Sequence, residues 1–590
     1  MKKISSYILK YWYAYALALV FMVISISLDM LSPQVTKRII DDVIMGGNMG
    51  IFPKLLLLIF IIALGRCIFQ YGKELIFDLV SSKIACDIRK HLFTHIQSLS
   101  LSFFDKTNTG ELMSRVKDDV DKIWGALGFV GMLIVEVVIH TAIVLFCMIR
   151  LSPSLTIIPL IAMPLIGAVA IIMEKKLGKI YGEISEENAT LNTVAQENLA
   201  GVRTVKAFAR EKHEIKKFLS HNKRYYELNM QQSKVFIKYY PLFQFVTRLL
   251  PLFIIVIGGF QVIQDKISIG TLAAFTEYSM NIVWPMEILG WLSNDFSSAL
   301  ASIKKIKKIY AEEPIITEIQ EPVILEEVKG SIRFDHVSFT IGEKTILSDI
   351  SFNLPAGKMI GIMGATGTGK SSIINLLQRF YDVNEGEITL DGVNIKELTL
   401  KELRRSISLV MQDVFLFSDT INENIKMGKK YLVNEQEILA AVSDAQAKDF
   451  IERMDRQYDT IVGERGVGLS GGQKQRISIA RALAKKNPIL VMDDSTSALD
   501  METEYMIQKA LVELAATKII IAHRISAVKN ADEIIILDEG KIVERGTHET
   551  LLKEQGYYYK TYMAQYGDYV SDHKKGVELC QSMQPETMNM

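Results

Sequence analysis

Eight consecutive residues, from Gly364 to Ser371, have the side-chain types and the spacing needed to hold a phosphate group. They read Gly-Ala-Thr-Gly-Thr-Gly-Lys-Ser, two glycines framing four residues and followed by a lysine and a hydroxyl. Glycines let backbone N–H groups turn toward an anion, and a helix N-terminus adds partial positive charge. Lys370 would reach the β- and γ-phosphates, and the Ser371 hydroxyl would ligate Mg²⁺. The stretch therefore predicts a site for ATP or GTP. The expected contact residues are Gly364, Thr366, Gly367, Thr368, Gly369, Lys370, Ser371 and Ser372.

The segments on either side of this stretch supply the elements that would position it. Met359–Met363 reads as a buried strand, and Ser372–Leu377 opens an amphipathic helix. A glycine-rich turn in an unrelated α/β protein is the alternative interpretation. A phosphate-binding loop needs a strand before it and a helix after it, so nucleotide binding is the favoured interpretation.

The composition indicates a chain divided between membrane and water. Its 590 residues exceed what one hydrophobic core holds, so two or more domains are expected. Hydrophobic residues make up 49% and the mean hydropathy is +0.19, high for a soluble enzyme and low for a chain wholly in a membrane. Basic and acidic residues balance at 67 each, which gives no indication of a nucleic-acid partner. The four cysteines lack metal-site or disulfide spacing, and no cleavable signal peptide is expected.

Apolar runs are concentrated in residues 1–310, which we expect to form a transmembrane domain. A membrane-crossing helix needs about 20 predominantly apolar residues, and six segments qualify. They lie at about 12–32, 54–77, 125–148, 154–173, 246–264 and 272–292. Long basic segments separate the second span from the third and the fourth from the fifth, and they read as helices. By the positive-inside rule these helical extensions and both termini face the cytoplasm.

The rest of the chain reads as a linker, a nucleotide-binding domain and a tail. Residues 311–330 form a polar break with several glutamates and two prolines. Short apolar strands alternate with helices over 331–567, as in an α/β domain. Residues 568–590 are polar and are expected to be disordered. The expected fold class is a multidomain membrane protein, a six-helix all-α transmembrane domain with long cytoplasmic extensions followed by an α/β phosphate-loop domain.

Seven ionisable residues fall inside or at the ends of the predicted spans. They are Asp29, Arg66, Glu136, His140, Arg248, Glu277 and Glu287. Such groups are costly in lipid and usually face protein or a wet cavity. One interpretation is a substrate path, and the other is contacts between helices or an interfacial position. The second is favoured for Asp29 and Arg66, whereas both stay open for Glu136, Arg248 and Glu287.

Further motifs in the second half of the chain resemble those of the ATP-binding cassette (ABC) family. Leu469–Gln473, which reads Leu-Ser-Gly-Gly-Gln, is similar to the family signature. Other segments resemble the glutamine loop (Gln412), the exporter cross-link loop (Gly463–Gly466), the acid that ends an apolar strand (Asp493), the dimer-interface loop (Ser497–Asp500) and the switch histidine (His523). The order of these segments along the chain and the spacing between them match those of the family throughout. The resemblance implies ATP and Mg²⁺ as cofactors, with the metal held by Ser371, Gln412 and Asp493.

Segments of the membrane half resemble the exporter branch of the same family. They lie at 103–120, 197–208 and 269–275. The resemblance covers nearly the whole chain and implies a half-transporter that works as a pair. Each ATP would lie between the phosphate loop of one chain and the signature of the other, with contacts from Ser470, Gly471, Gly472 and Gln473. Short coupling helices near Asp118–Asp121 and Phe208–Glu211 would carry closure of the nucleotide-binding domains to the spans.

Two positions depart from the family pattern. Where the family has a glutamate as general base, this chain has Asp494, whose carboxylate lies on the order of 1.5 Å further back. Where the family places an aromatic residue against adenine, this chain has Ile341. Both belong to the site built on the chain's own phosphate loop, whereas the signature, which serves the partner's site, is intact. The predicted catalytic residues are Asp494, as a poor base, and His523.

This asymmetry resembles one subunit of a heterodimeric exporter, which would move amphipathic drugs or lipids outward across a bacterial plasma membrane. The expected partners are a second half-transporter, membrane lipid and an amphipathic small molecule, with no nucleic acid. The alternatives are a homodimer with two slow sites, an exporter dedicated to one compound such as a peptide or lipid, and an importer with the exporter fold. The six spans exclude a soluble cassette protein of DNA repair or translation.

Overall fold

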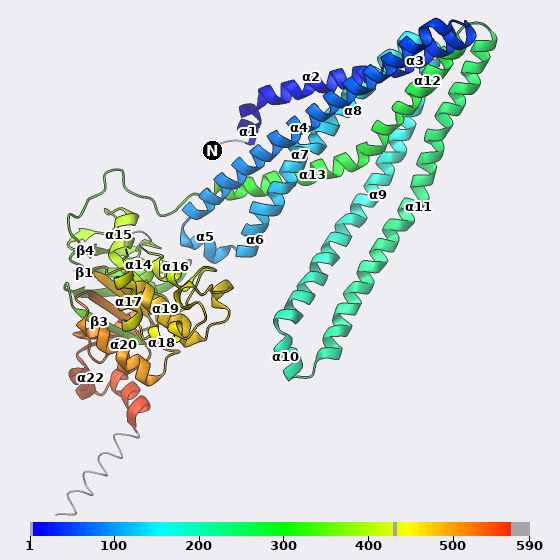
Figure 1. Cartoon of the computed structure of the whole chain (residues 1–590). Helices are drawn as coiled ribbons and strands as arrows, with labels where there is room; N and C mark the ends of the chain where they lie inside the picture. The colour runs from blue at the N-terminus through cyan, green and yellow to red at the C-terminus, as the bar shows by residue number, and fades with distance from the viewer. Residues whose placement is uncertain (1–3, 429–432, 568–590) are drawn as a thin grey trace, which may run out of the picture. The chain divides into compact units, whose positions relative to one another are not determined.

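The chain forms two compact units, which a computed structural model describes over residues 4–428 and 433–567 (Figure 1). The first unit comprises Met1–Leu99 and Thr107–Glu313, and the second comprises Ser100–Lys106 and Pro314–Met590. The boundary at Glu313 falls near the start of the segment expected to be a linker. The tail that was expected to be disordered, 568–590, lies outside the described residues.

The second unit takes in one short helix from the first half of the chain, α5 (Leu101–Lys106). Ser100, just before this helix, accepts hydrogen bonds through Oγ from the backbone N–H groups of Ile315, at 2.8 Å, and of the next residue, at 3.0 Å. The hydroxyl of Tyr381 donates to the carboxylate of Asp105. These polar contacts hold α5 within the second unit.

Helices make up the first unit. In chain order they are α1 (Ile4–Lys10), α2 (Trp12–Asp29), α3 (Ser32–Arg38), the π-helix η1 (Ile39–Met45), the 3₁₀-helix η2 (Met49–Ile51), α4 (Phe52–Ser98), α6 (Thr109–Ser114), the π-helix η3 (Arg115–Asp119), α7 (Val120–Leu127), α8 (Phe129–Leu151), α9 (Pro153–Ala200), α10 (Val202–Ala207), α11 (Glu211–Ile263), α12 (Ile269–Asn281) and α13 (Val283–Ala311). Their main core includes the fully buried side chains of Met22, Met148 and Tyr278.

Three helices of this unit are far longer than a membrane is thick. Helices α4, α9 and α11 contain 47, 48 and 53 residues. At about 1.5 Å per residue they reach on the order of 70–80 Å, against a hydrocarbon core of about 30 Å. Helices α9 and α11 pack side by side and are joined through α10 (Figure 1). The helical structure predicted for the two long basic segments is confirmed, although the first is interrupted after Ser98 and the second at Gly201 and at Phe208–Arg210. The segments Asp118–Asp121 and Phe208–Glu211 both belong to this unit.

Within the described residues, five helical stretches are long and apolar enough to cross a membrane. They are Trp12–Met45, Met49–Ser98, Thr109–Leu151, Pro153–Ala200 and Glu211–Ile263, and they contain the first five predicted spans. The sixth, at 272–292, is not among them. Its residues fall in α12 and α13, which are separated at Ile282, and Glu277 and Glu287 lower the hydropathy of the stretch. A count of six spans is therefore not confirmed and stays a prediction.

The second unit is an α/β domain, which confirms the predicted class. Its strands are β1 (Ile332–Ile341), β2 (Lys344–Leu354), β3 (Met359–Gly364), β4 (Glu385–Leu390), β5 (Val393–Asn394), β6 (Ile407–Val410), β7 (Ile489–Asp493), β8 (Thr517–Ile521), β9 (Glu533–Asp538) and β10 (Lys541–Gly546). Besides α5, its helices are α14 (Lys370–Leu377), α15 (Leu400–Ser406), α16 (Ile421–Lys426), α17 (Glu435–Asp444), α18 (Lys448–Glu452), α19 (Gly471–Ala484), α20 (Met501–Glu513), α21 (Ile525–Val528) and α22 (His548–Glu554), with 3₁₀ turns η4 (Gln457–Asp459) and η5 (Glu464–Gly466) and a last helical stretch, 557–567.

Two sheets organise this unit. The larger has the strand order β10-β9-β3-β8-β7-β6, in which only β10 pairs antiparallel among the described strands, and the smaller is antiparallel with the order β2-β1-β4-β5. Strands β3, β7 and β8 are buried along their whole length. Parallel strands covered on both faces read as such continuous apolar runs. One hydrophobic core is formed between the smaller sheet, α14 and the larger sheet, and a second is formed between the larger sheet and the helices α16 to α21.

Candidate functional site

Four parallel strands of the larger sheet end at the same edge, and the predicted nucleotide-site residues follow them. The strands β3, β8, β7 and β6 are successive neighbours, with register pairs Ile362–Ile521, Ile521–Asp493 and Met492–Val410. The residues placed at this edge are the phosphate loop after β3, His523 after β8, Asp493 and Asp494 at the end of β7, and Gln412 after β6. Open α/β sheets bind ligands at the carboxyl ends of their strands. The strand order therefore brings these predicted groups together.

The phosphate loop has a backbone that requires glycine where it turns. The φ angle is +149° at Gly364 and +96° at Gly369. A Cβ on Gly364 would lie 2.2 Å from the carbonyl oxygen of Leu537, and one on Gly369 would lie 2.7 Å from Leu347 Cδ2. The loop leads into α14, whose first backbone N–H groups have no acceptor within the helix. Thr366, Gly367 and Thr368 lie in the bend of the loop, and Ser371 and Ser372 in the first turn of α14. The loop is thus shaped to bind an anion through main-chain donors.

Lys370 is buried against its own loop. Its ammonium group donates to the carbonyl oxygens of Gly364 at 2.9 Å and Ala365 at 2.7 Å, and the residue is 7% exposed. Burial lowers the pKa of Lys370, and the carboxylates of Asp493 and Asp494 oppose that shift. The lysine is therefore within electrostatic range of both acids at the end of β7, in position to place a cation beside phosphate oxygens.

The carboxyl group of Asp493 is suited to Mg²⁺. Burial raises the pKa of Asp493, a hydrogen bond with Ser371 lowers it, and the neighbouring Asp494 raises it again. Carboxylate and hydroxyl oxygens are ligands that Mg²⁺ accepts, and the ion usually adds substrate phosphates and water. Over residues 4–428 and 433–567, no three His, Cys, Asp or Glu side chains are grouped as a metal site. The oxygens of Asp493 and Ser371 fit a Mg²⁺ ion that shares its ligands with a nucleotide, and Gln412 is exposed at the same edge.

Asp494 and His523 lie on neighbouring loops. Asp494 has φ +41°, and its backbone N–H donates to the carbonyl oxygen of Ile521 at 2.8 Å, so the sheet fixes its Cα. The charge of His523 lowers the pKa of Asp493, which puts the histidine within range of the same acids. Ile341, at the end of β1, is 52% exposed and offers an apolar face without a ring.

The signature residues form the N-terminus of α19. Ser470 Oγ accepts from the Gln473 N–H at 3.3 Å, and Gln473 Oε1 accepts from the Ser470 N–H at 2.9 Å, a reciprocal cap. Ser470 and Gly471 are solvent-exposed, and Gln473 is half-buried, so the start of α19 is accessible to a second chain. A Cβ on Gly472 would lie 3.1 Å from the carbonyl oxygen of Ala498. The signature therefore packs against the segment that resembles the dimer-interface loop.

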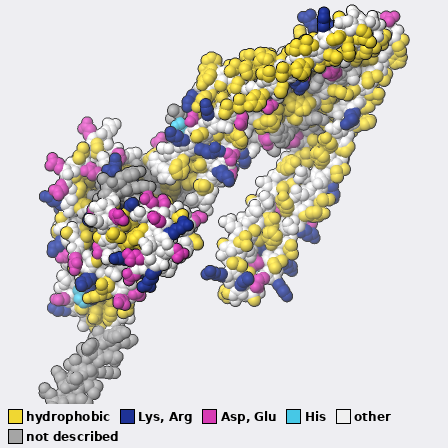
Figure 2. Space-filling model, viewed as in Figure 1, with side chains coloured by type: hydrophobic (Ala, Val, Ile, Leu, Met, Phe, Trp, Pro, Cys, Tyr) yellow, Lys and Arg dark blue, Asp and Glu magenta, His cyan; other side chains and the backbone are white. Residues whose placement is uncertain are grey.

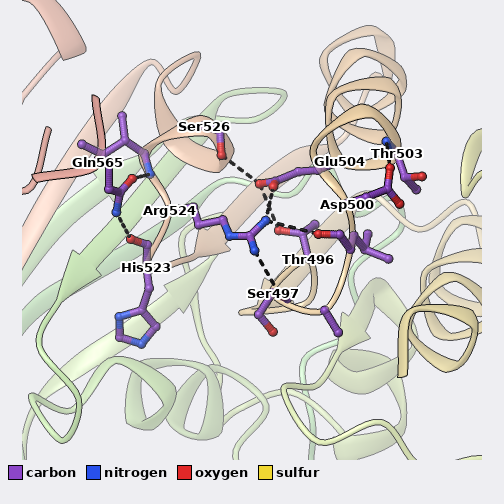
Figure 3. Close-up of polar contacts among 12 residues, drawn as sticks. Thr496, Ser497, Asp500, Thr503, Glu504, His523, Arg524, Ser526 and Gln565 are labelled. Atoms are coloured by element: carbon purple, nitrogen blue, oxygen red, sulfur yellow. Dashed lines mark hydrogen bonds and ion pairs between the residues drawn. The ribbon is translucent and has the colours of Figure 1, made fainter. Parts of the chain in front are cut away.

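Gln475, which belongs to the continuation of the signature, holds these loops together with two polar residues outside the sequence motifs, Glu504 and Gln565. Gln475, on α19, hydrogen-bonds to the segment that resembles the dimer-interface loop. Glu504, on α20, forms an ion pair with Arg524, and Gln565 hydrogen-bonds to the loop that carries His523 (Figure 3). A polar residue on a helix beside a motif is too common a pattern to have identified Glu504 and Gln565 from the sequence.

Four of the seven ionisable residues expected in the spans line one cavity of the first unit. The cavity measures about 300 Å³, and its walls include Asp29, Arg66, Gln70, Glu136, His140 and Trp284. Arg66 forms an ion pair with Asp29, and Glu136 pairs at 2.8 Å with Lys73, whose side chain is fully buried. Contacts between helices and a polar cavity are therefore both present at these residues. Yellow apolar side chains dominate the visible outer surface of the same helices (Figure 2). The side chain of Glu287 lies outside the described residues.

Comparisons with known proteins agree with this arrangement along nearly the whole chain. The family profile described as ABC transporter transmembrane region matches residues 15–286, and the profile described as ABC transporter matches residues 347–497. The ATP-dependent lipid A-core flippase of Desulfotalea psychrophila (strain LSv54 / DSM 12343) is 36% identical over 571 residues, which cover 96% of this chain and 99% of that protein. YgaD of Bacillus subtilis (strain 168), a proposed multidrug export ATP-binding/permease protein, is 33% identical over 574 residues, covering 95% and 98%.

A solved structure gives the same result for the fold. The structure of a bacterial Atm1-family ABC exporter with ATP bound matches with a TM-score of 0.79 and 28% identity, covering 94% of this chain and 98% of that chain. The chain therefore belongs to the ABC transporter family, as a multi-pass membrane half-transporter with the exporter fold, whose ATP-binding domain couples ATP hydrolysis to transport.

Proposed function

We propose that this chain is one subunit of a heterodimeric exporter that moves amphipathic drugs or lipids outward across a bacterial plasma membrane. The names of two relatives refer to a lipid and to multiple drugs, which supports this substrate class. A polar cavity of about 300 Å³ beside long apolar helices suits a molecule with a charged head and an apolar body. Both termini and the ATP-binding unit would lie in the cytoplasm, where ATP is present.

The proposal of a heterodimer rests mainly on the position of Asp494. Because its backbone N–H bonds to Ile521 of the neighbouring strand, its carboxylate cannot move forward without distorting the sheet. A general base works at about 2.6–3.2 Å from the group whose proton it takes. An aspartate here would therefore be a poor base, while the intact signature at Ser470–Gln473 would complete a competent site on the partner. The proposed pair has one slow ATP site and one fast ATP site.

The side chains at the chain's own site have separate tasks in this proposal. Lys370 and the N–H groups of the loop would neutralise and orient the phosphates. Ser371 and Asp493 would hold Mg²⁺, which neutralises developing charge on the phosphate oxygens when bound. Asp494 would accept the proton of the attacking water inefficiently, and His523 would donate a hydrogen bond to the γ-phosphate.

The test compares the chain purified alone with the chain co-expressed with a second half-transporter, the product of a neighbouring gene. Both preparations are reconstituted in lipid vesicles, and their ATPase rates are measured. We expect slow turnover by the chain alone, fast turnover by the pair, and loss of the fast turnover when the partner's glutamate base is replaced by glutamine. Turnover by the chain alone at the rate of the pair would contradict the proposal and favour a homodimer.

The substrate class and direction need a second measurement. Sealed inverted vesicles with the pair are given a fluorescent lipid or an amphipathic dye. ATP-dependent accumulation inside the vesicles is expected for an exporter. Accumulation only in right-side-out vesicles would instead indicate an importer, and transport of a peptide but of neither probe would indicate a dedicated exporter.

A further inference from the structure

Arg524, whose side chain is 40% exposed, connects two loops at the carboxyl edge of the larger sheet through an ion pair with a buried carboxylate on α20 and a hydrogen bond to a loop carbonyl. We name residues 523–526 the switch loop and residues 497–500 the interface loop. Arg524 donates to Glu504 Oε2 at 2.7 Å and to the carbonyl oxygen of Ser497 at 3.2 Å. Glu504 is 3% exposed, and its other carboxylate oxygen accepts from a switch-loop hydroxyl at 2.9 Å. A buried carboxylate needs such partners, so the two loops keep a fixed relation to each other.

The interface loop is in turn fixed to the signature helix. Gln475 on α19 is 5% exposed; its Nε2 donates to Ser497 Oγ at 3.3 Å, and its Oε1 accepts from the Ala498 N–H at 3.1 Å. The backbone oxygen of Ala498 lies against Gly472 of the signature. A displacement of the switch loop would therefore shift the interface loop through Arg524, and the interface loop would shift the signature through Gln475.

Gln565 holds the switch loop from the other side. It belongs to the last helical stretch, 557–567, and lies 42 residues further along the chain than His523. Its Nε2 donates to the His523 carbonyl oxygen at 2.8 Å, and its Oε1 accepts from the Ile525 N–H at 3.0 Å. Figure 3 shows Gln565 on one side of the loop and the imidazole ring of His523 on the other. One amide group thus fixes the backbone on both sides of Arg524.

The contacts of Gln565 differ from those of a residue that serves only stability. The residue is exposed and borders a groove of about 1020 Å³. Its neighbour Tyr566 packs against the apolar core, and Tyr558 of the same helical stretch is fully buried, so these residues dock the helix. Gln565 adds little apolar burial, and both of its hydrogen bonds go to the two peptide units that aim the histidine and the arginine.

We propose that Gln565 is a positioning residue, through which the last helical stretch sets the placement of His523 in the ATP site and of the interface loop that supports the signature. This inference rests on the proposed role of His523 at the γ-phosphate. A side chain that acts in this way alters turnover and leaves nucleotide affinity unchanged, because its contacts lie on the switch loop and not on the phosphate loop.

The test uses the full chain in lipid nanodiscs and steady-state hydrolysis of radiolabelled ATP over a range of ATP concentrations. Gln565→Met removes both hydrogen bonds at similar side-chain length, Gln565→Glu keeps the acceptor for Ile525, and Lys560→Met is the matched control on an exposed residue of the same stretch. We expect kcat to fall about tenfold in Gln565→Met, with an intermediate fall in Gln565→Glu and KM for ATP within about twofold of the wild type. Hydrogen–deuterium exchange of residues 523–526 should become faster in Gln565→Met only.

His523→Ala separates the failure of this inference from the failure of the proposed function. If His523→Ala lowers kcat and Gln565→Met does not, Gln565 has no positioning role and the proposed function stands. If His523→Ala leaves kcat unchanged, the role of the histidine is wrong and so is an effect exerted through it. A fall in kcat that is matched by a fall in the unfolding temperature, or shared by Lys560→Met, would show general loosening of the helix and overturn the inference.

Discussion

Lengthening the acid at position 494 by one methylene should speed ATP hydrolysis by this chain. The Asp494 N–H is bonded to the carbonyl oxygen of Ile521 at 2.8 Å, so the backbone stays in place while the carboxylate moves. Asp494→Glu advances the carboxylate by about 1.5 Å, one carbon–carbon bond. A general base accepts a proton over heavy-atom distances of about 2.6–3.2 Å, a range of about 0.6 Å, and the step of about 1.5 Å is larger than this range. A positioned base contributes about 10²–10⁴-fold, so kcat should rise by about 100-fold or more, with KM for ATP within about twofold.

The assay is steady-state hydrolysis of radiolabelled ATP, over a range of ATP concentrations, by the chain purified without a partner in lipid vesicles. Asp494→Gln is the matched control, because it has the length of glutamate and cannot accept the proton. Both variants place a longer side chain at φ +41°, so equal unfolding temperatures would show equal backbone strain. The reasoning is refuted if Asp494→Glu is no faster than the wild type, or if Asp494→Gln is as fast as Asp494→Glu.

Three further predictions concern the phosphate loop, the membrane helices and the end of the second unit. Gly364→Ala would place a Cβ 2.2 Å from a main-chain oxygen and should abolish ATP binding. A Cβ on Gly367 meets nothing within 4 Å, so Gly367→Ala should cost only the backbone strain of its positive φ, about 1–3 kcal/mol. Titration with a fluorescent ATP analogue compares the two variants, and equal affinities would contradict the prediction. Lys73→Met leaves Glu136 buried without its cation and should destabilise the protein by about 3–5 kcal/mol. Adding Glu136→Leu should recover most of that stability, as measured by thermal unfolding, and a double variant as unstable as Lys73→Met would contradict the prediction. Burial lowers the pKa of His548 in the folded protein below its usual value of about 6.5, so its contribution to stability is fully present above a pH of about 6.5 and is lost as the pH falls through the pKa of the folded state. The unfolding temperature should therefore fall more steeply with acidification in the wild type than in His548→Gln, and identical dependences of unfolding temperature on pH would exclude the effect.

The phosphate loop could be predicted from sequence because all of its parts are consecutive. Strand, glycines, Lys370 and helix follow one another along the chain, so local pattern and local structure coincide. The convergence of Gln412, Asp493 and His523 on that loop is different. It depends on the strand order β3-β8-β7-β6, in which β3 lies beside β8 although β4 to β7 come between them in the chain, and only the family resemblance anticipated it.

Contacts between distant segments were beyond the sequence pattern. The pairing of Lys73 with Glu136 requires knowledge of which faces of α4 and α8 meet. The interruption of the first basic segment after Ser98 was missed because the residues that follow are not strong helix breakers. Gln565 contacts a backbone 42 residues away through geometry that side-chain type does not encode.

The placement of α5 has a consequence for the order in which the protein is made. The helix Leu101–Lys106 leaves the ribosome long before Tyr381 and Ile315, which hold it in the second unit, have been synthesised. Chains fold from the N-terminus as they emerge, so this segment must wait while the intervening helices enter the membrane. A gene fragment beginning at Pro314 would encode the ATP-binding unit without it, and the shortest continuous fragment that contains the complete unit also contains most of the helices of the other.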